Sequence, residues 1–456
     1  MEYRTLGRTN LKVSILSLGG GAFYNPRIQS DNVTEIIKYC VANGINFIDT
    51  AEDYDETKLR EGLKDTREKV ILNSKSTSSN KESMVKSIEN SLKKLGTDII
   101  DIYQMQTLMD KDDLKNRIKN GALDAIKEAK KQGKINFIGF SSHRIPTIIE
   151  AIKTKEFDVV ELPYSIGQYE SEKAIQVAKK YNVGVIAINV FGGGILVDRN
   201  KMSKSASFMT SKNAMQYVIS NNNITTALIG MSSIEHVKEN IEVANNLRIV
   251  SNKDRKKIEE KVYKFLGKDF CRSCKACMPC DVHGWQFSID NFLRFKAFYS
   301  NYGYKVFMNE YQKLPIKADK CILCGKCESR CPYNVKIMQK LKKTHEILNL
   351  NITQEDFKER IKEYFNRGFI DKDVLQKIVT YWNELGRDIA ADKINSFFMP
   401  IGKKPDQDKE KISRIILAGM FYLSKKQFLE SLRPYIGNLF LFKQMLKNRL
   451  SKILKA

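Results

Sequence analysis

The chain has 456 residues, 42% of them hydrophobic, and a net charge of +24. This length exceeds one ordinary core and predicts two or three domains, while the apolar content excludes an intrinsically disordered chain. Most of the positive charge lies after residue 250, but no aromatic-interleaved basic motif accompanies it, so we expect no nucleic-acid partner. The longest apolar run, residues 415–423, is too short to span a bilayer, and residues 1–10 show no signal-peptide pattern. We expect a cytoplasmic protein.

Short runs rich in β-branched residues alternate with segments of helical spacing through the first half of the chain. Residues 81–96 repeat apolar side chains every three or four positions and end at Gly96, a helix stop signal matched by Gly44 and Gly133. Eight strands alternating with helices predict an α/β fold, a (β/α)8 TIM barrel over residues 1–266. An open doubly wound sheet is the alternative, although no G-x-G-x-x-G turn follows the first strand. The predicted strands are residues 13–21, 46–51, 70–76, 99–106, 135–142, 159–165, 184–191 and 226–233.

Polar residues follow the predicted strands where a barrel of this type carries its chemistry. Asp49 ends the second strand and is followed by Tyr54. Lys75 ends the third strand and Gln106 the fourth. A lysine ammonium beside a phenol lowers the pKa of the phenol, and an aspartate balances the lysine. This set predicts a proton donor for a carbonyl oxygen that gains negative charge as hydride arrives. The alternative is that each residue is a solvated loop charge or a helix cap.

Five segments, FIDTAEDY, NSKS, DIYQMQ, FIGFSSH and IGMSSIEHVKEN, occur in this order along the chain. With them, the sequence from residue 2 to about residue 248 resembles the aldo-keto reductases. The resemblance implies a nicotinamide-dependent carbonyl reductase with Asp49, Tyr54 and Lys75 as catalytic residues and Gln106 beside the substrate. It also implies NADP(H) or NAD(H) as cofactor, held by Ser141, Ser142, Glu161 and Ile188 at the nicotinamide end and by Ser232, Ser233, Glu239 and Asn240 at the phosphate and adenine end.

Four positions depart from the pattern of that family. Gln106 stands where the family usually has histidine, and an amide can polarise a carbonyl but cannot transfer a proton. Glu161 replaces a glutamine, and an ionised carboxylate only accepts hydrogen bonds. Ile188 replaces an aromatic residue that stacks on the nicotinamide. His236 replaces an arginine that binds the 2′-phosphate, so the sequence leaves open whether the cofactor is NADPH or NADH. The departures at Gln106, Glu161 and Ile188 motivate a second hypothesis, an electron-transfer or assembly protein whose barrel is a catalytically weakened scaffold.

Eight of the nine cysteines lie in two runs, and the ninth, Cys40, fits the apolar pattern of a core. The spacing C-x2-C-x2-C-x3-C-P at residues 321–332 is typical of a [4Fe–4S] cluster, and the run at 271–280 is one residue shorter at its last gap. Zinc is the alternative, but zinc sites normally divide their ligands between two hairpins. The layout resembles a dicluster ferredoxin domain, residues 267–348, fused to an aldo-keto reductase. It implies two [4Fe–4S] clusters in a reducing compartment, with the fourth cysteine of each run serving the other cluster. The expected ligands are Cys271, Cys274, Cys277, Cys280, Cys321, Cys324, Cys327 and Cys331.

The remaining residues, 349–456, are predicted to form a basic helical extension with a break near Pro400 and Pro405. Residues 435–456 place apolar side chains on one stripe among basic residues. Such a helix covers the protein's own core or, alternatively, lies on a membrane surface or binds a partner. The whole sequence predicts an iron–sulfur oxidoreductase of the aldo-keto reductase type. We expect a small carbonyl or alcohol substrate and an external electron-transfer partner.

Overall fold

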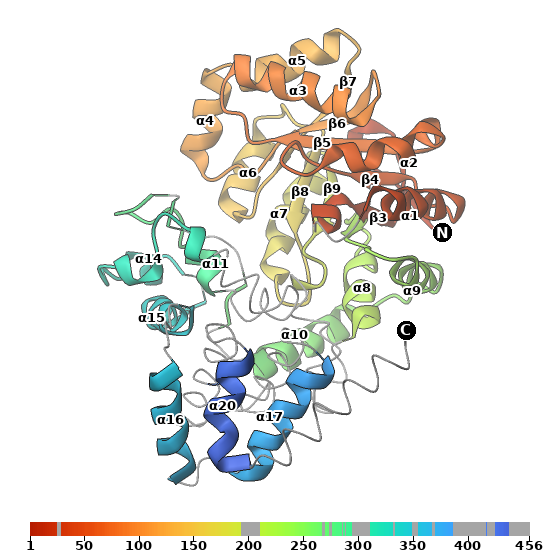
Figure 1. The fold of residues 1–456 in the computed structure, drawn as a ribbon. Coiled ribbons are helices and arrows are strands. Elements are labelled where there is room, and N and C mark those ends of the chain that lie inside the picture. The colour runs from red at the N-terminus through yellow and green to blue at the C-terminus, as the bar shows by residue number, and fades with distance from the viewer. Residues whose placement is uncertain are drawn as a thin grey trace. The chain divides into compact units, whose positions relative to one another are not determined.

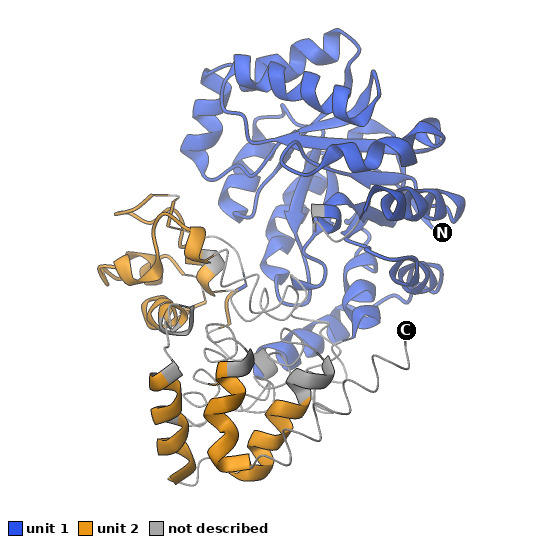
Figure 2. Ribbon diagram, viewed as in Figure 1, with its two compact units in different colours: residues 1–197, 208–264, 272–275 blue, residues 198–207, 265–271, 276–456 orange. Residues whose placement is uncertain are grey.

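The computed structural model describes residues 1–24, 29–192, 210–266, 270–272, 276–284, 286–287, 289–293, 311–331, 333–348, 354–366, 370–385, 416 and 425–436. Its contacts divide the chain into two compact units, shown in Figure 2. Unit 1 comprises residues 1–197, 208–264 and 272–275, and unit 2 comprises residues 198–207, 265–271 and 276–456. Each unit is described by itself below.

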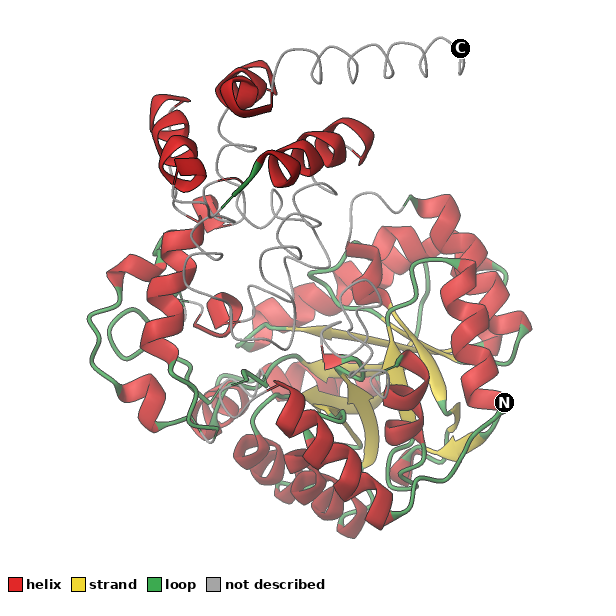
Figure 3. Cartoon of the chain, turned by 90° about the horizontal axis from the view of Figure 1, so that it is seen from below, coloured by secondary structure: helices red, strands yellow, loops and turns green. Residues whose placement is uncertain are grey.

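Unit 1 contains a closed barrel of eight parallel strands, which confirms the predicted fold and excludes the open sheet (Figures 1 and 3). Every predicted strand contributes one member, and neighbours along the chain are neighbours in the barrel, with β10 closing the circle between β9 and β3. The strands are β3 (Leu16–Gly19), β4 (Phe47–Asp49), β5 (Ile71–Ser76), β6 (Ile100–Met105), β7 (Ile135–Ser141), β8 (Val159–Pro163), β9 (Gly184–Ile188) and β10 (Thr226–Ile229).

Helices surround the yellow strands of Figure 3. The predicted helix at 81–96 is α3, which begins after Asn80, whose side chain accepts a hydrogen bond from Ser83 N, and ends at Gly96 with φ +68°. Asparagine at the start and a left-handed glycine at the end are common helix caps. The helices of this region are α1 (Ser30–Ala42), α2 (Arg60–Lys64), α3 (Lys81–Leu95), α4 (Lys111–Lys119), α5 (Ala122–Lys131), α6 (Ile145–Lys153), α7 (Glu172–Lys180), α8 (Ser211–Ile219), α9 (Ile234–Asn245) and α10 (Asn252–Leu266).

A small hairpin closes one end of the barrel. Strands β1 (Tyr3–Thr5) and β2 (Lys12–Ser14) pair antiparallel, so the predicted single strand at 13–21 is divided between β2 and β3. Leu6 and Val13 of this segment pack against Phe47 and Val159, which are the first residues of β4 and β8. The amino ends of the strands are therefore filled by apolar side chains, and the carboxyl ends are left for chemistry.

Unit 2 is helical in the part that the structure describes. Its buried apolar side chains form one cluster that includes residues of both the predicted ferredoxin domain and the predicted extension, such as Phe292, Tyr311, Phe357 and Phe428. The predicted break near Pro400 lies outside the described residues, as does the predicted C-terminal helix beyond Ile436. No helix within the described ranges is long and apolar enough to cross a membrane. The helices are α11 (Ile289–Leu293), α14 (Lys326–Ser329), α15 (Ile337–Leu348), α16 (Gln354–Asn366), α17 (Lys372–Leu385) and α20 (Lys425–Ile436).

Substitution of two adjacent glycines after β3 tests how closely the backbone of the barrel approaches Asp49. A Cβ on Gly20 would lie 2.5 Å from the carbonyl oxygen of Asp49, whereas a Cβ on Gly21 would lie 3.5 Å from Tyr54 Oη, an ordinary contact. Gly20→Ala should therefore lower the free energy of unfolding by about 1–3 kcal/mol. Gly21→Ala should change it by less than about 0.5 kcal/mol. Chemical unfolding followed by circular dichroism measures both, and equal stability of the two variants would contradict the close approach.

Candidate active site

Neighbouring strands place polar side chains inside the barrel near its carboxyl ends. Asp49 is the last residue of β4 and lies opposite Asn73 of β5, and Lys75 of β5 lies opposite Gln104 of β6. Glu161 comes from β8. All five are at most 4% exposed. Sequence reasoning missed Asn73 and Gln104, although each lies two positions from a predicted site residue, the spacing that puts strand residues on one face.

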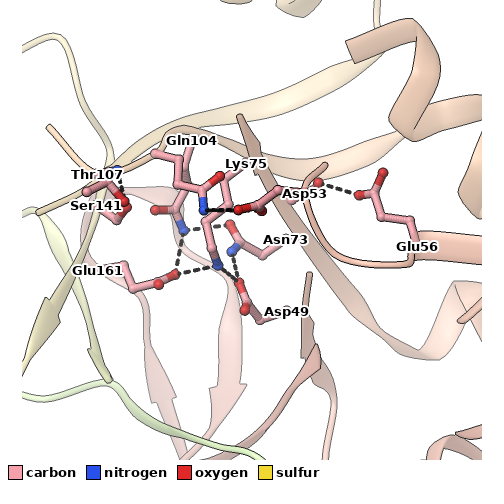
Figure 4. Close-up of polar contacts among 11 residues, drawn as sticks. Asp49, Asp53, Glu56, Asn73, Lys75, Gln104, Thr107, Ser141 and Glu161 are labelled. Carbon is pink, nitrogen blue, oxygen red and sulfur yellow. Dashed lines mark hydrogen bonds and ion pairs between the residues drawn. The ribbon is translucent and has the colours of Figure 1, made fainter. Parts of the chain in front are cut away.

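These five side chains close a ring of hydrogen bonds, shown in Figure 4. Lys75 Nζ donates to Asp49 Oδ1 and, at 3.1 Å, to Glu161 Oε2. Asn73 Nδ2 donates to the same Asp49 oxygen at 2.5 Å. Gln104 Nε2 donates to Asn73 Oδ1 at 2.8 Å and to Glu161 Oε2 at 3.2 Å. The ring therefore holds one ammonium between two carboxylates.

Burial and charge act against each other in this ring. Burial raises the pKa of Asp49 to about 7, with Lys75 acting to lower it and Glu161 to raise it further. For Lys75, burial lowers the pKa, but the two carboxylates outweigh it and hold the pKa above the usual range for lysine. The two carboxylates thus favour the protonated form of Lys75, and burial favours the neutral form of Asp49.

Tyr54 lies next to the ring, with Lys75 Nζ 6.0 Å from the centroid of its aromatic ring. No hydrogen bond joins these two side chains among the described residues. Burial raises the pKa of Tyr54 to about 12; Lys75 lowers it, whereas Asp49, Glu161 and Asp53 raise it. The prediction of a phenol with a lowered pKa is therefore wrong. The lysine acts in the predicted direction, but the loss of water around the phenol outweighs it.

Gln106, just beyond β6, is fixed by its backbone. Its N–H donates to Ser76 O at 2.8 Å, and its carbonyl accepts a hydrogen bond from Arg117 Nη1 at 2.9 Å. The side-chain Nε2 donates to the two carboxylate oxygens of Asp53 at 3.3 and 3.4 Å. Gln106 Oε1 is buried and has no hydrogen-bond partner in the described part of the chain. One amide proton and one acceptor are therefore left for a ligand.

The two serines predicted to bind the nicotinamide differ in whether their hydroxyl has a hydrogen bond left for a ligand. Ser142 is fully buried, and its Oγ both donates to Leu108 O at 2.7 Å and accepts from Arg144 N at 3.1 Å. Ser141 Oγ accepts from Thr107 N at 2.8 Å, and its own proton has no acceptor among the described residues. Ser141 is thus the serine with a hydrogen bond to offer.

The other two residues predicted at the nicotinamide end, Glu161 and Ile188, also differ from each other. The Oε2 atom of Glu161 accepts hydrogen bonds from Lys75 and Gln104, so this carboxylate belongs to the ring. Ile188 ends β9 and is half-buried, and it packs against the apolar residues inside the barrel. Its apolar side chain can face a flat ring but offers it no hydrogen bond.

Helix α9 begins at the predicted phosphate end. Ser233 precedes the helix, and its Oγ accepts from His236 N at 3.3 Å; Ser232 Oγ lies 3.3 Å from His236 Nδ1. Glu239 is exposed and Asn240 is buried. The start of a 12-residue helix offers backbone N–H groups and a positive dipole end, which suit a phosphate.

Four of the eight cysteines predicted as cluster ligands lie together in unit 2. One pocket is lined by Cys280 of the first run together with Cys321, Cys324 and Cys327 of the second. The fourth cysteine of one run thus joins the first three of the other. Cys274 lies outside the described residues. Within the residues that are described, no three His, Cys, Asp or Glu side chains converge closely enough to hold a single metal ion.

Arg330 joins the two cysteine runs. Its Nη2 donates to Cys277 O at 3.0 Å and Pro279 O at 2.7 Å, and its Nη1 pairs with Asp281 at 2.7 Å. Arg330 also lines the pocket of the four cysteines, and its Nε is buried without a hydrogen-bond partner among the described residues. A buried unpaired N–H is costly, and a cluster sulfur is a suitable acceptor for it.

Comparisons with known proteins agree with both units. Residues 15–215 match the model of the aldo/keto reductase family, and residues 270–336 match that of the 4Fe-4S dicluster domain. The uncharacterized oxidoreductase YqkF of Bacillus subtilis (strain 168) is 24% identical over 293 residues, which cover 55% of this chain and 93% of the relative. L-galactose dehydrogenase of Arabidopsis thaliana is 25% identical over 287 residues, 54% of this chain and 89% of the relative.

Among solved structures, the aldo-keto reductase AKR11C1 from Bacillus halodurans (holo form) matches the barrel with a TM-score of 0.51. It is 24% identical, and the match covers 57% of this chain and 96% of that chain. This likeness supports the fold of unit 1. With the two family matches and the oxidoreductases among the relatives, the chain is an oxidoreductase in which an aldo/keto reductase domain precedes a 4Fe-4S dicluster domain.

Proposed function

We propose that the protein interconverts a small carbonyl compound and its alcohol with a nicotinamide cofactor. The observation that carries this proposal is the buried set of Asp49, Lys75 and Glu161 beside Tyr54. These residues lie near the carboxyl ends of the strands, where barrel enzymes bind their substrates. The opposite end is filled by the hairpin and its apolar contacts.

Tyr54 would be the proton donor. With a pKa of about 12 its phenol stays protonated at neutral pH, and Oη would give its proton to the carbonyl oxygen as negative charge develops there. Lys75 would stabilise the resulting phenolate, because its ammonium is held by two carboxylates and keeps its proton. Solvent would then return a proton to Tyr54. The free amide proton of Gln106 would donate a hydrogen bond to the same substrate oxygen.

The residues at both ends of the predicted cofactor site fit a nicotinamide dinucleotide. The Ser141 hydroxyl has a proton to donate, and the start of α9 suits a phosphate. When bound, the cofactor would supply two electrons as hydride. His236 lacks the planar fork with which an arginine grips a 2′-phosphate, so we propose that NADH serves as well as NADPH.

We propose two [4Fe–4S] clusters in unit 2. The pocket with four cysteines and the buried Nε–H of Arg330 support one of them. Each cluster would pass single electrons, whereas hydride carries two. We therefore also propose an external partner that exchanges one electron at a time. We propose a cytoplasmic location, because cysteines of this kind stay reduced there. One cluster would be held by Cys280, Cys321, Cys324 and Cys327, and the other by Cys271, Cys274, Cys277 and Cys331.

A second candidate function is an electron-transfer or assembly protein with a catalytically weakened barrel. The raised pKa of Tyr54 and the second carboxylate on Lys75 favour it. Anaerobic fluorescence titration with NADPH and with NADH separates the two candidates. Saturable binding of either cofactor supports the enzyme hypothesis. If neither cofactor binds, the result supports the hypothesis of a weakened scaffold.

Tyr54→Phe tests the proton donor. The change removes one hydroxyl, so turnover of an aromatic aldehyde should fall by about 10²–10⁴-fold while the dissociation constant of NADPH stays nearly unchanged. Oxidation of NADPH followed by absorbance gives the rate. Tyr263→Phe, at an exposed position of α10, is the matched control and should keep full activity. An active Tyr54→Phe variant would rule out the acid role.

The pH dependence tests the coupling between the ring and Tyr54. As pH rises through about 7, Asp49 ionises, and its negative charge raises the pKa of Tyr54 and weakens it as an acid. Carbonyl reduction should therefore slow across this range. Glu161→Gln removes a charge that raises the pKa of Asp49, so the midpoint of the kcat profile should move to lower pH. Glu128→Gln, on the exposed face of α5, should leave the midpoint in place; an unmoved midpoint in Glu161→Gln would count against the coupling.

Iron analysis tests the cluster ligands. Protein purified without oxygen should contain about eight irons and eight sulfides per chain. Cys280→Ser and Cys331→Ser should each bring the content towards about four, because each removes a ligand from one of the two clusters. Cys40→Ala, in the buried core of unit 1, is the control and should keep the full content. Stoichiometric zinc without iron would overturn the assignment.

A further inference from the structure

Three large apolar side chains of unit 2 lie in solvent next to the cysteines. Ile322 is 62% exposed, Leu323 is 61% exposed and Val282 is 49% exposed. We call these three residues the cysteine-loop patch. Single apolar residues are ordinary on a protein surface, but a group gathered at one site indicates a surface for interaction.

The cysteine-loop patch borders the proposed cluster site. Val282 and Ile322 line the same pocket as Cys280, Cys321 and Cys324, and Leu323 lies next to Ile322 in the chain. Cys324 itself is exposed. A protein that binds to the patch would therefore lie next to the proposed ligands of the cluster.

The three side chains of the patch lie outside the apolar core of unit 2. The apolar core of unit 2 forms without them, from residues that include Phe287, Phe292 and Ile337. Leu323 has φ +58°, in the left-handed region that a bulky residue rarely adopts. Such conformations persist where the surrounding structure fixes them, and they gather at functional sites.

Basic residues outnumber acidic ones in the two segments that carry the patch, and the lysine nearest to it in the chain, Lys320, has its Nζ 3.8 Å from Asp319 Oδ2. Lys320 and Lys326 stand on either side of Ile322 and Leu323 in the loop, and their side chains are 68% and 64% exposed. The nearby carboxylate of Asp281 is taken up by Lys326 at 3.3 Å and by Arg330 at 2.7 Å. Residues 276–284 and 311–348 together carry nine lysines and arginines against four acidic residues. The complementary surface on a partner is therefore acidic.

We propose that the cysteine-loop patch is the docking surface for a small acidic protein that carries one electron. This inference rests on the proposed function in that it takes a cluster to be bound in the pocket. One electron would pass between the carrier and the cluster, so that one is oxidised as the other is reduced, and no proton or group moves. Encounters between redox proteins use small interfaces, which a patch of three apolar side chains with a basic rim suits.

Reduced flavodoxin, a small acidic one-electron protein, is the probe. It is mixed anaerobically with the oxidised iron–sulfur protein, and the loss of cluster absorbance in a stopped-flow instrument gives a second-order rate constant. The rate constant should fall as salt is added, because exposed opposite charges steer the encounter. Lys320→Glu should lower it about tenfold at low salt. Ile322→Ser with Leu323→Asn should also lower it, and asparagine is chosen because it tolerates the left-handed backbone.

Two changes at exposed positions of unit 1 are the matched controls. Lys86→Glu repeats the charge reversal and Ile99→Ser repeats the loss of an exposed isoleucine, and both should leave the rate constant unchanged. Unchanged rate constants in iron-replete patch variants, or a faster reaction of Lys320→Glu, would overturn the docking surface. Patch variants that change the oligomeric state in gel filtration would assign the surface to a second copy of the chain instead. Absence of iron from the native protein would contradict the cluster proposal itself, so the two failures are distinguishable.

Discussion

The ammonium of Lys75 between the carboxylates of Asp49 and Glu161 is the constraint on which the rest of the site depends. A buried cation requires a partner, and a second carboxylate makes the set one negative charge too many when all three are ionised. The amides of Asn73 and Gln104 complete the ring, but they bring no charge. Burial raises the pKa of Asp49 to about 7, and the charge of Glu161 acts in the same direction while Lys75 opposes it. Strands β4, β5, β6 and β8 must therefore keep their register for the ring to exist.

The second carboxylate also changes what the barrel can offer to a ligand. A glutamine at position 161 would have both a donor and an acceptor for a carboxamide, whereas ionised Glu161 only accepts and already serves Lys75 and Gln104. Ser142 is likewise used within the protein. Of the described residues predicted or found at the nicotinamide end, Ser141 and Gln106 have a hydrogen bond left for a ligand. A ligand in this site thus meets fewer fixed partners than the family pattern implies, and a more strongly charged floor.

The strands and helices of the barrel could be predicted from the sequence because the periodicity of apolar residues and the positions of turn residues indicate them. The apolar runs predict all eight strands, and the repeat of apolar side chains with Gly96 as stop signal predicts α3. The charged site residues were found at strand ends, where Asp49 and Lys75 do meet. The sign of the pKa shift of Tyr54 was missed, because desolvation depends on how much water the fold removes, and spacing does not show this. Asn73 and Gln104 were missed because an uncharged amide looks ordinary until its partners are known.

The two kinds of chemistry proposed for this chain have opposite requirements for solvent. Proton transfer to a developing oxyanion benefits from fixed charges in a dry site, and Lys75 and Asp49 are only 3% and 2% exposed. Exchange of single electrons with another protein needs a cofactor near the surface, and Cys324 and Ile322 lie in solvent. One site could not meet both requirements, because the water that admits a partner would screen the charges that stabilise the oxyanion. Separate units satisfy them independently, so a barrel and a cysteine-rich domain can share one chain without either being compromised.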